Sequence, residues 1–431
     1  MVLNRGKVDD DDPYKKSAVV YEWLFGYNLP DTVLLLRKDG TVYFLGTKKK
    51  VEFLQPVVQA LASGKYKSNK MKLSEFRTLL RNKSDNNASN YDTLWEAAGI
   101  VDLNGTKRKV GIFVKERTFN VNGGGIVGPW EEKLSPVAKT NGDSETGGST
   151  MVELVDVSHG VAFCMSVKDE TELDLMKKSS VLSNKVMKHG WIKKMEQVID
   201  GEESITHDKL ATYIDEILED PSKISLKVPR EDVASCYFPI VQSGGEYDLR
   251  VTAQTSSTTN LSHDVITVSL GARYKGYCSN IARTFLVDPP KHVSELYEVL
   301  CDLQDECISA LKPGNQFSMV HKTAVDFLKT YKRSGSPAGS YAYLVDHLPK
   351  SLGFLTGIDF RENHLQLSAK NSATIKAGMV FCLSIGFANL PLSEKDRADT
   401  PDKSPVRPEN QCFHLFGWLP AVLSHAFVPF S

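Results

Sequence analysis

The chain lacks the features that mark membrane proteins, disulfide-stabilised proteins and strongly charged proteins. None of its 431 residues lie in a window approaching the roughly 18 uninterrupted apolar residues of a membrane span, so no transmembrane helix is expected. Its seven cysteines include no CxxC pair, and an odd number argues against a disulfide framework and favours a reducing compartment. Lysine plus arginine total 52 against 53 acidic residues, so no net field attracts nucleic acid or a membrane.

Short catalytic and cofactor-binding motifs are also missing. The sequence contains no HExxH, Walker A, GxSxG or EF-hand pattern, and its ten histidines have no spaced partners that would form a zinc site. Gly123–Gly128 matches GxGxxG, but a dinucleotide site needs that turn to open a full helix. Pro129 and Pro136 leave room for barely one helical turn, so we predict a loop there.

Length and hydrophobic patterning predict two domains with mixed helices and strands, an α+β class. Val33–Leu36 and Thr41–Leu45 flank a Lys-Asp-Gly turn, which indicates a hairpin. Past a boundary near residue 168, apolar residues recur at helical spacing from Leu173 to Val198, which predicts one long helix. Another helix is expected to start near Ser318, whose hydroxyl would cap its first turn. Further helices are expected at 210–218 and 294–311, and strands at 266–270, 281–287 and 379–383.

The C-terminal half carries the layout of a known metal site without its ligands. The layout consists of Val268–Gly271, Gly276–Thr284, Gly353–Gly357 and Gly378–Ser384. These segments resemble those of the pita-bread metallopeptidases (methionine aminopeptidase, prolidase, aminopeptidase P and creatinase), where they carry Asp, Asp, His and Glu. The same positions here hold Ser269, Asn280, Phe354 and Ser384.

The chemistry of these four side chains argues against a metal centre. Two divalent cations close together repel each other, and bridging carboxylates must offset that repulsion. Ser269 and Asn280 offer only neutral oxygens, Phe354 offers no ligand atom, and Ser384 offers a hydroxyl in place of a carboxylate. Arg361 stands where the resemblance would place a second, assisting histidine. We therefore expect no bound metal, no cofactor and no catalytic residue, only a small neutral pocket or packed core.

Further segments resemble one branch of this fold, the large subunit of the FACT histone chaperone. They are Trp23–Tyr27, Lys48–Leu54, Pro239–Tyr247, Tyr277–Asn280 and Gly357–Glu362. The resemblance implies a creatinase-like N-terminal lobe at 1–168 and a pita-bread lobe at 169–431, with 406–431 unassigned. The family's extra helix and strand before Lys7, its middle domain and its acidic tail are missing, and the match fades beyond about Pro405. Phe413–Phe416 could begin the strand of a fifth ligand position, but Gly417–Ser431 does not continue it. We expect an isolated N-terminal module or an incomplete gene product.

The resemblance implies a non-catalytic nuclear subunit that reorganises nucleosomes on chromosomes during transcription, DNA replication and DNA repair. Its implied partners are the core histones, as the H2-type dimer and H3–H4, and an HMG-box FACT subunit bound through regions largely absent here. It implies neither sequence-specific DNA binding nor membrane association. Acidic groups around a peptide-shaped cleft would attract basic histones. The candidate binding residues are Glu246, Asp359, Arg361 and Glu362; ordinary surface charge is the alternative interpretation.

Two other functions remain open from the sequence. An active metal-dependent Xaa-Pro-type aminopeptidase would need its ligands shifted to Asp264 or Asp288, and that shift would lose the landmarks at Gly271 and Arg283. A purely structural lobe that contacts other replication or transcription proteins requires only a surface. The sequence does not separate this last function from histone binding.

Overall fold

A computed structural model of the chain divides into two compact units, Met1–Val161 and Ala162–Ser431. The predicted boundary after residue 168 falls a few residues beyond this division. Within the described ranges, no helix combines the length and apolar composition that a bilayer-spanning segment needs. The structure describes residues 1–6, 14–63, 73–99, 108–116, 125–138, 152–245, 247–248, 250, 252–263, 265–333, 335, 337–388, 390 and 420–422.

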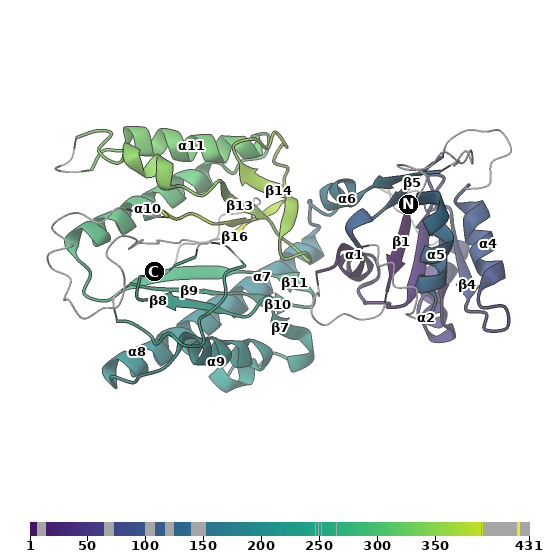
Figure 1. Ribbon diagram of the computed structural model, residues 1–431, viewed down its shortest axis with the longest axis horizontal. Coiled ribbons are helices and arrows are strands. Elements are labelled where there is room, and N and C mark those ends of the chain that lie inside the picture. The colour runs from purple at the N-terminus through teal and green to yellow at the C-terminus, as the bar shows by residue number, and fades with distance from the viewer. Residues whose placement is uncertain are drawn as a thin grey trace. The chain divides into compact units, whose positions relative to one another are not determined.

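The first unit contains two small sheets with helices packed on them (Figure 1). The four-stranded sheet has the order β1 (Val2–Arg5), β2 (Thr32–Leu36), β3 (Thr41–Gly46), β4 (Glu75–Leu80), and only its β3–β4 pair is parallel. The β2–β3 pair confirms the predicted hairpin. In the second sheet, β5 (Arg108–Ile112) runs parallel to β6 (Val152–Asp156). The helices are α1 (Lys16–Phe25), α2 (Lys48–Phe53), α3 (Gln55–Ala62), α4 (Ala88–Ala97), α5 (Val127–Ala138) and α6 (Ser158–Cys164), the last crossing the division between units.

The predicted loop after the glycine-rich segment is wrong, because a twelve-residue helix, α5, begins at Val127. Pro129 lies in its first turn, where a missing N–H costs nothing because that group has no intrahelical partner. The Asp31 carboxylate accepts hydrogen bonds from the backbone N–H groups of Ile126, at 2.7 Å, and Val127, at 3.3 Å. A protein carboxylate therefore occupies the helix N-terminus, where a phosphate would bind in a dinucleotide site.

One continuous helical segment opens the second unit, as predicted, but it is not uniform. It comprises α7 (Glu170–Lys185), a π-helix (Val186–Ile192) and α8 (Lys193–Asp200). A reciprocal capping box starts it: the Asp169 carboxylate accepts from the Glu172 N–H, and the Glu172 carboxylate accepts from the Asp169 N–H, each at 2.9 Å. The fully buried Trp191 in the π-helix packs into the core shared with α9 (His207–Glu219).

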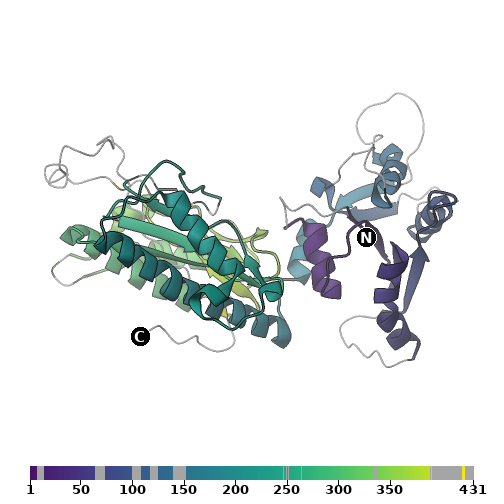
Figure 2. The same cartoon turned by 90° about the horizontal axis from the view of Figure 1, so that it is seen from below.

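In the second unit, strands lie between two groups of helices (Figures 1 and 2). Helices α7 to α9 share one core with β8 (Ile240–Ser243), β9 (Val265–Leu270) and β12 (Ile281–Leu286), which pair antiparallel in the order β12-β9-β8. Helices α10 (Lys291–Ala310) and α11 (Phe317–Thr330) share another core with β13 (Ser351–Leu355), β14 (Glu362–Ser368) and β15 (Val380–Leu383). A third sheet joins β11 (Tyr277–Cys278), β10 (Ala272–Tyr274) and β7 (Val233–Ser235). Helices flanking antiparallel sheets confirm the predicted α+β class.

Two local predictions in the second unit are wrong. The helix expected near Ser318 is α11, which begins at Phe317, but the predicted cap is wrong: the N-cap is Gln316, and the Ser318 hydroxyl donates to the Gln316 side chain at 3.4 Å. The last described residues form β16 (Pro420–Val422), which pairs antiparallel with β15, although no continuing strand was expected in Gly417–Ser431. Phe413–Phe416 lie outside the described residues.

Gly353 allows β13 to approach β15 closely. Its φ of +143° is one that side-chain-bearing residues rarely adopt, and it is paired with Leu383. A Cβ atom at this position would lie 2.2 Å from the Cys382 carbonyl oxygen and 3.0 Å from Leu383 Cα. Because both contacts are to backbone, the clash cannot be relieved by a side-chain rotation.

We therefore predict that Gly353→Ala lowers the free energy of unfolding by about 3 kcal/mol. Gly160→Ala is the control, because a Cβ there meets nothing within 4 Å and alanine favours the α6 helix. Urea unfolding followed by circular dichroism measures both variants. Equal unfolding midpoints for the two variants would contradict the proposed clash.

Candidate functional site

Strand pairing places the four positions of interest on, or next to, four strands of the second unit. In β9, Ser269 pairs with Ala282 of β12, and Asn280 directly precedes β12. In β13, Phe354 pairs with Cys382 of β15, and Ser384 directly follows β15. Asn280 and Phe354 are each only 4% exposed.

A tyrosine from a different segment joins two of these positions. The Tyr237 hydroxyl lies 2.5 Å from the Ser269 hydroxyl and donates a hydrogen bond to the Asn280 side-chain carbonyl. Since the phenol has one proton, which goes to Asn280, Ser269 is the donor to Tyr237. The Asn280 amide nitrogen in turn lies 3.8 Å from the Cys382 sulfur, which links β12 to β15. These four residues form what we call the neutral cluster.

The protonation of the neutral cluster is set by burial. Desolvation raises the pKa of Tyr237 well above its ordinary value, and the hydrogen bonds with Ser269 and Asn280 only partly oppose this. Desolvation likewise raises the pKa of the Cys382 thiol well above its ordinary value. Both groups therefore stay protonated and uncharged at neutral pH, and neither supplies an anionic metal ligand or a ready nucleophile.

An aromatic layer covers the neutral cluster. The Phe360 ring packs against Tyr237 with 5.0 Å between centroids, and against Phe354, edge to face, with 5.7 Å between centroids. The Arg361 guanidinium carbon lies 5.7 Å from the Phe354 ring centroid, within cation–π range. Partial burial lowers the pKa of Arg361.

The residues present do not fit a pair of divalent cations. The neutral cluster contains no carboxylate, and an apolar ring stands at Phe354. The Ser384 N–H donates to the Leu352 carbonyl at 2.9 Å, and among the described residues its hydroxyl forms no hydrogen bond with the cluster. Over the same described ranges, no group of three or more His, Cys, Asp or Glu side chains is arranged to hold a metal ion.

The proposed acidic rim is not assembled as the sequence suggested. Glu362 is only 4% exposed because it is the first residue of β14 and pairs with Leu355, so it does not face solvent. Asp359 is half-buried, and its carboxylate accepts from the Arg361 N–H at 3.4 Å. Glu246 lies outside the described residues.

An acidic surface that the sequence reasoning missed lies on α10. We call it the α10 acidic face; its exposed members are Glu298, Asp302, Asp305 and Glu306. Spacings of three and four residues put them on one side of the helix. The Arg333 guanidinium pairs with Glu298 at 2.5 Å. The acidic repeat from residue 295 to 306 is visible in the sequence, and together with the opposite apolar stripe it could have identified this face.

Comparison with known proteins gives one consistent family. The profile of the FACT complex subunit SPT16 N-terminal lobe domain matches residues 1–147, and that of metallopeptidase family M24 matches 174–413. FACT complex subunit SPT16 of Dictyostelium discoideum is 36% identical over 90% of this chain and 33% of its own length. The N-terminal domain of FACT complex subunit SPT16 from Cicer arietinum is 31% identical, with a TM-score of 0.77 over 97% of this chain and 87% of that one. This chain belongs to the FACT complex subunit SPT16 family.

The SPT16 resemblance predicted from the sequence is thereby confirmed, and so is the fold of a creatinase-like lobe followed by a pita-bread lobe. This SPT16-family chain spans about a third of the length of the curated relatives that it matches. An X-Pro aminopeptidase from Thermotoga maritima is 15% identical, with a TM-score of 0.57 over 97% of this chain and 94% of that one. At that identity the likeness shows a shared fold alone.

We predict that Tyr237→Phe destabilises the second unit by about 1–3 kcal/mol, because it leaves the buried Asn280 carbonyl and the half-buried Ser269 hydroxyl without their partner. Tyr213→Phe, which alters an exposed tyrosine on α9, is the matched control and is expected to change the free energy of unfolding by less than about 0.5 kcal/mol. Chemical denaturation of both variants provides the comparison. If Tyr237→Phe unfolds at the same denaturant concentration as the wild type, the tyrosine does not hold the cluster together.

Proposed function

We propose that this chain is a non-catalytic, histone-binding module of a FACT complex, acting in nucleosome reorganisation during transcription, DNA replication and DNA repair in the nucleus. Its proposed partners are the core histones, as the H2-type dimer and H3–H4. An HMG-box subunit is proposed to join the complex through other regions of the full-length protein. Membership of the SPT16 family supports this assignment.

The observation that carries the non-catalytic part is the neutral cluster. A hydrolytic metal pair needs anionic bridging ligands and a water molecule between them. The Tyr237 hydroxyl fills the space between Ser269 and Asn280, and both of those side chains are neutral. The alternative of an active Xaa-Pro aminopeptidase gains no support from Asp288, which follows the end of β12, and Asp264 lies outside the described residues.

The α10 acidic face supports the histone-binding part. Histones are strongly basic, and exposed carboxylates raise the rate of encounter with a basic partner and give salt-sensitive binding. Four exposed acidic residues lie within nine residues of one helix, so this face is strongly negative although the net charge of the whole chain is only −1. This face replaces the rim at Glu246, Asp359 and Glu362 as the main candidate surface.

We predict saturable binding of the chain to refolded H2-type dimer or H3–H4, with a defined stoichiometry that persists at near-physiological salt. Neutralising two acids of the α10 face, Asp305→Asn with Glu306→Gln, should weaken this binding by about three- to tenfold. The control variant, Glu196→Gln with Asp200→Asn, removes the same charge from exposed positions of α8 and should have much less effect. Isothermal titration calorimetry at low and near-physiological salt measures all three proteins.

Two results would count against this proposal. Binding that vanishes at near-physiological salt would indicate generic charge attraction, and the lobe would then be a docking surface for other replication or transcription proteins. Equal weakening in the two paired variants would show that net charge, and not the α10 acidic face, governs the interaction.

A further inference from the structure

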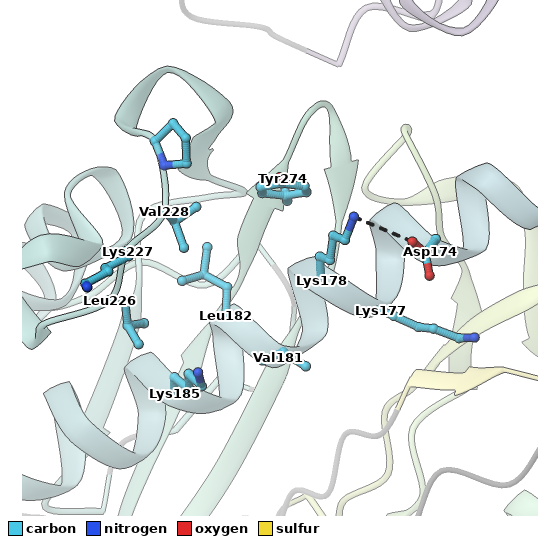
Figure 3. Close-up of a pocket in the computed structure, with 11 residues that line it drawn as sticks. Asp174, Lys177, Lys178, Val181, Leu182, Lys185, Leu226, Lys227, Val228 and Tyr274 are labelled. Atoms are coloured by element: carbon cyan, nitrogen blue, oxygen red, sulfur yellow. Dashed lines mark ion pairs between the residues drawn. The ribbon is translucent and has the colours of Figure 1, made fainter.

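A groove with the opposite charge runs along α7 in the second unit (Figure 3). Its volume is about 540 Å³. One wall is a single face of α7 between Asp174 and Lys185, and the other is formed by residues 226–229 together with Tyr274 of β10. In Figure 3 the side chains of Leu182 and Val228 face each other across the groove, and Lys177 and Lys227 extend outward from its two walls. It is built from elements of one compact unit and shares no residue with the neutral cluster or the α10 acidic face.

Lysines dominate the charge of this groove. It is lined by four lysines (Lys177, Lys178, Lys185 and Lys227) and by one acid, Asp174, which pairs with Lys178 at 3.5 Å. The four lysines are exposed, and among the described residues Lys177, Lys185 and Lys227 form no ion pair. A local excess of positive charge on a chain of net charge −1 favours an anionic partner and disfavours the basic histones.

The floor of the groove is apolar. Val181 is 47% exposed although it lies between two turns of lysines, and Leu182 beneath it is buried in the core with α9. Leu226, Val228 and Pro229 line the opposite wall. An exposed apolar strip bordered by charged residues is typical of a protein-binding surface, where side chains of the partner cover the apolar strip.

The dimensions and chemistry fit a short peptide better than a nucleic acid. The face of α7 from Asp174 to Lys185 extends about 16 Å, the length of about five residues of extended peptide. Nucleic-acid sites contact phosphates through lysine, arginine and helix N-termini, and they add arginine forks or stacked aromatic rings to hold the bases. The lining has no arginine and only one aromatic ring, and it uses the middle of a helix.

We propose that this groove binds a short acidic peptide segment that carries apolar anchor residues. The carboxylates of the segment pair with Lys177, Lys185 and Lys227 along the two walls. Its apolar side chains cover Val181 on α7 and Val228 on the opposite wall. The site thus gives the chain a second binding surface, for a partner opposite in charge to a histone.

The test uses the full chain and a fluorescein-labelled peptide in which glutamates alternate with leucines. Fluorescence anisotropy at near-physiological salt should show saturable one-to-one binding. Replacing the leucines of the probe by serine should weaken binding by about tenfold, because the apolar floor then gains no contact. A Val181→Ser variant should weaken the leucine probe and leave the serine probe unchanged, which a change in folding alone would not do.

Charge reversal provides the matched pair of variants. The first triple variant reverses the charge of three groove lysines and should weaken probe binding by at least about tenfold; it carries Lys177→Glu, Lys185→Glu and Lys227→Glu. The control triple variant makes the same change in net charge at exposed positions on and just before α11: Lys312→Glu, Lys322→Glu and Lys329→Glu. It should change probe binding by less than about twofold. Circular dichroism checks that both triple variants are folded.

Three results would overturn the proposal: no saturable binding of the glutamate–leucine probe, equal loss in the two triple variants, or equal binding of the leucine and serine probes. The last probe is a labelled oligothymidylate with the same net charge as the glutamate–leucine peptide. If it binds more tightly than the peptide and is lost in the Lys177, Lys185 and Lys227 variant, the groove is a nucleic-acid site instead.

Discussion

The Tyr237 hydroxyl forms hydrogen bonds with side chains from two other segments of the second unit. Without it, the polar groups of those side chains would lack a partner. Ser269 belongs to β9 and Asn280 to the entry of β12, and Asn280 extends the contact to Cys382 in β15. A buried carbonyl or hydroxyl without a partner destabilises a fold, so each member of the cluster depends on the others. Phe360 packs against both Tyr237 and Phe354, and each group of helices packs on its own apolar core.

The neutral cluster explains how the chain can share the fold of a metallopeptidase while lacking the anionic side chains that would hold its metal ions. The overall fold is shared with the X-Pro aminopeptidase, and the close approach of β13 and β15 at Gly353 is part of that fold in this chain. The side chains of the neutral cluster are uncharged and hydrogen-bonded to one another. Folds of this kind host unrelated functions at different surfaces. The α10 acidic face and the lysine-lined groove of α7 are two such surfaces, of opposite charge, on separate helices of the same unit.

Much of this fold was predictable, because periodic apolar residues and local turns determine it. The β2–β3 hairpin, the helical segment from α7 to α8 and the strands β9, β12 and β15 all follow from patterns a few residues long. The Ser269 and Asn280 substitutions were also readable from the landmarks beside them. Tyr237 was not, because it lies 32 and 43 residues from its two partners and nothing in its own neighbourhood marks it. Helix α5 was missed for a related reason: its N-terminus is stabilised by Asp31, which is distant in sequence.

The central claim is that the interior of the second unit is a packed neutral cluster and not a metal site. The most direct measurement is a titration of the purified chain with Mn²⁺ and Zn²⁺ by calorimetry, paired with a hydrolysis assay on Xaa-Pro peptides. The account predicts no stoichiometric binding of either ion at this site and no cleavage above the uncatalysed rate. Binding of one or two ions per chain, with hydrolysis that a chelator abolishes and added metal restores, would contradict it.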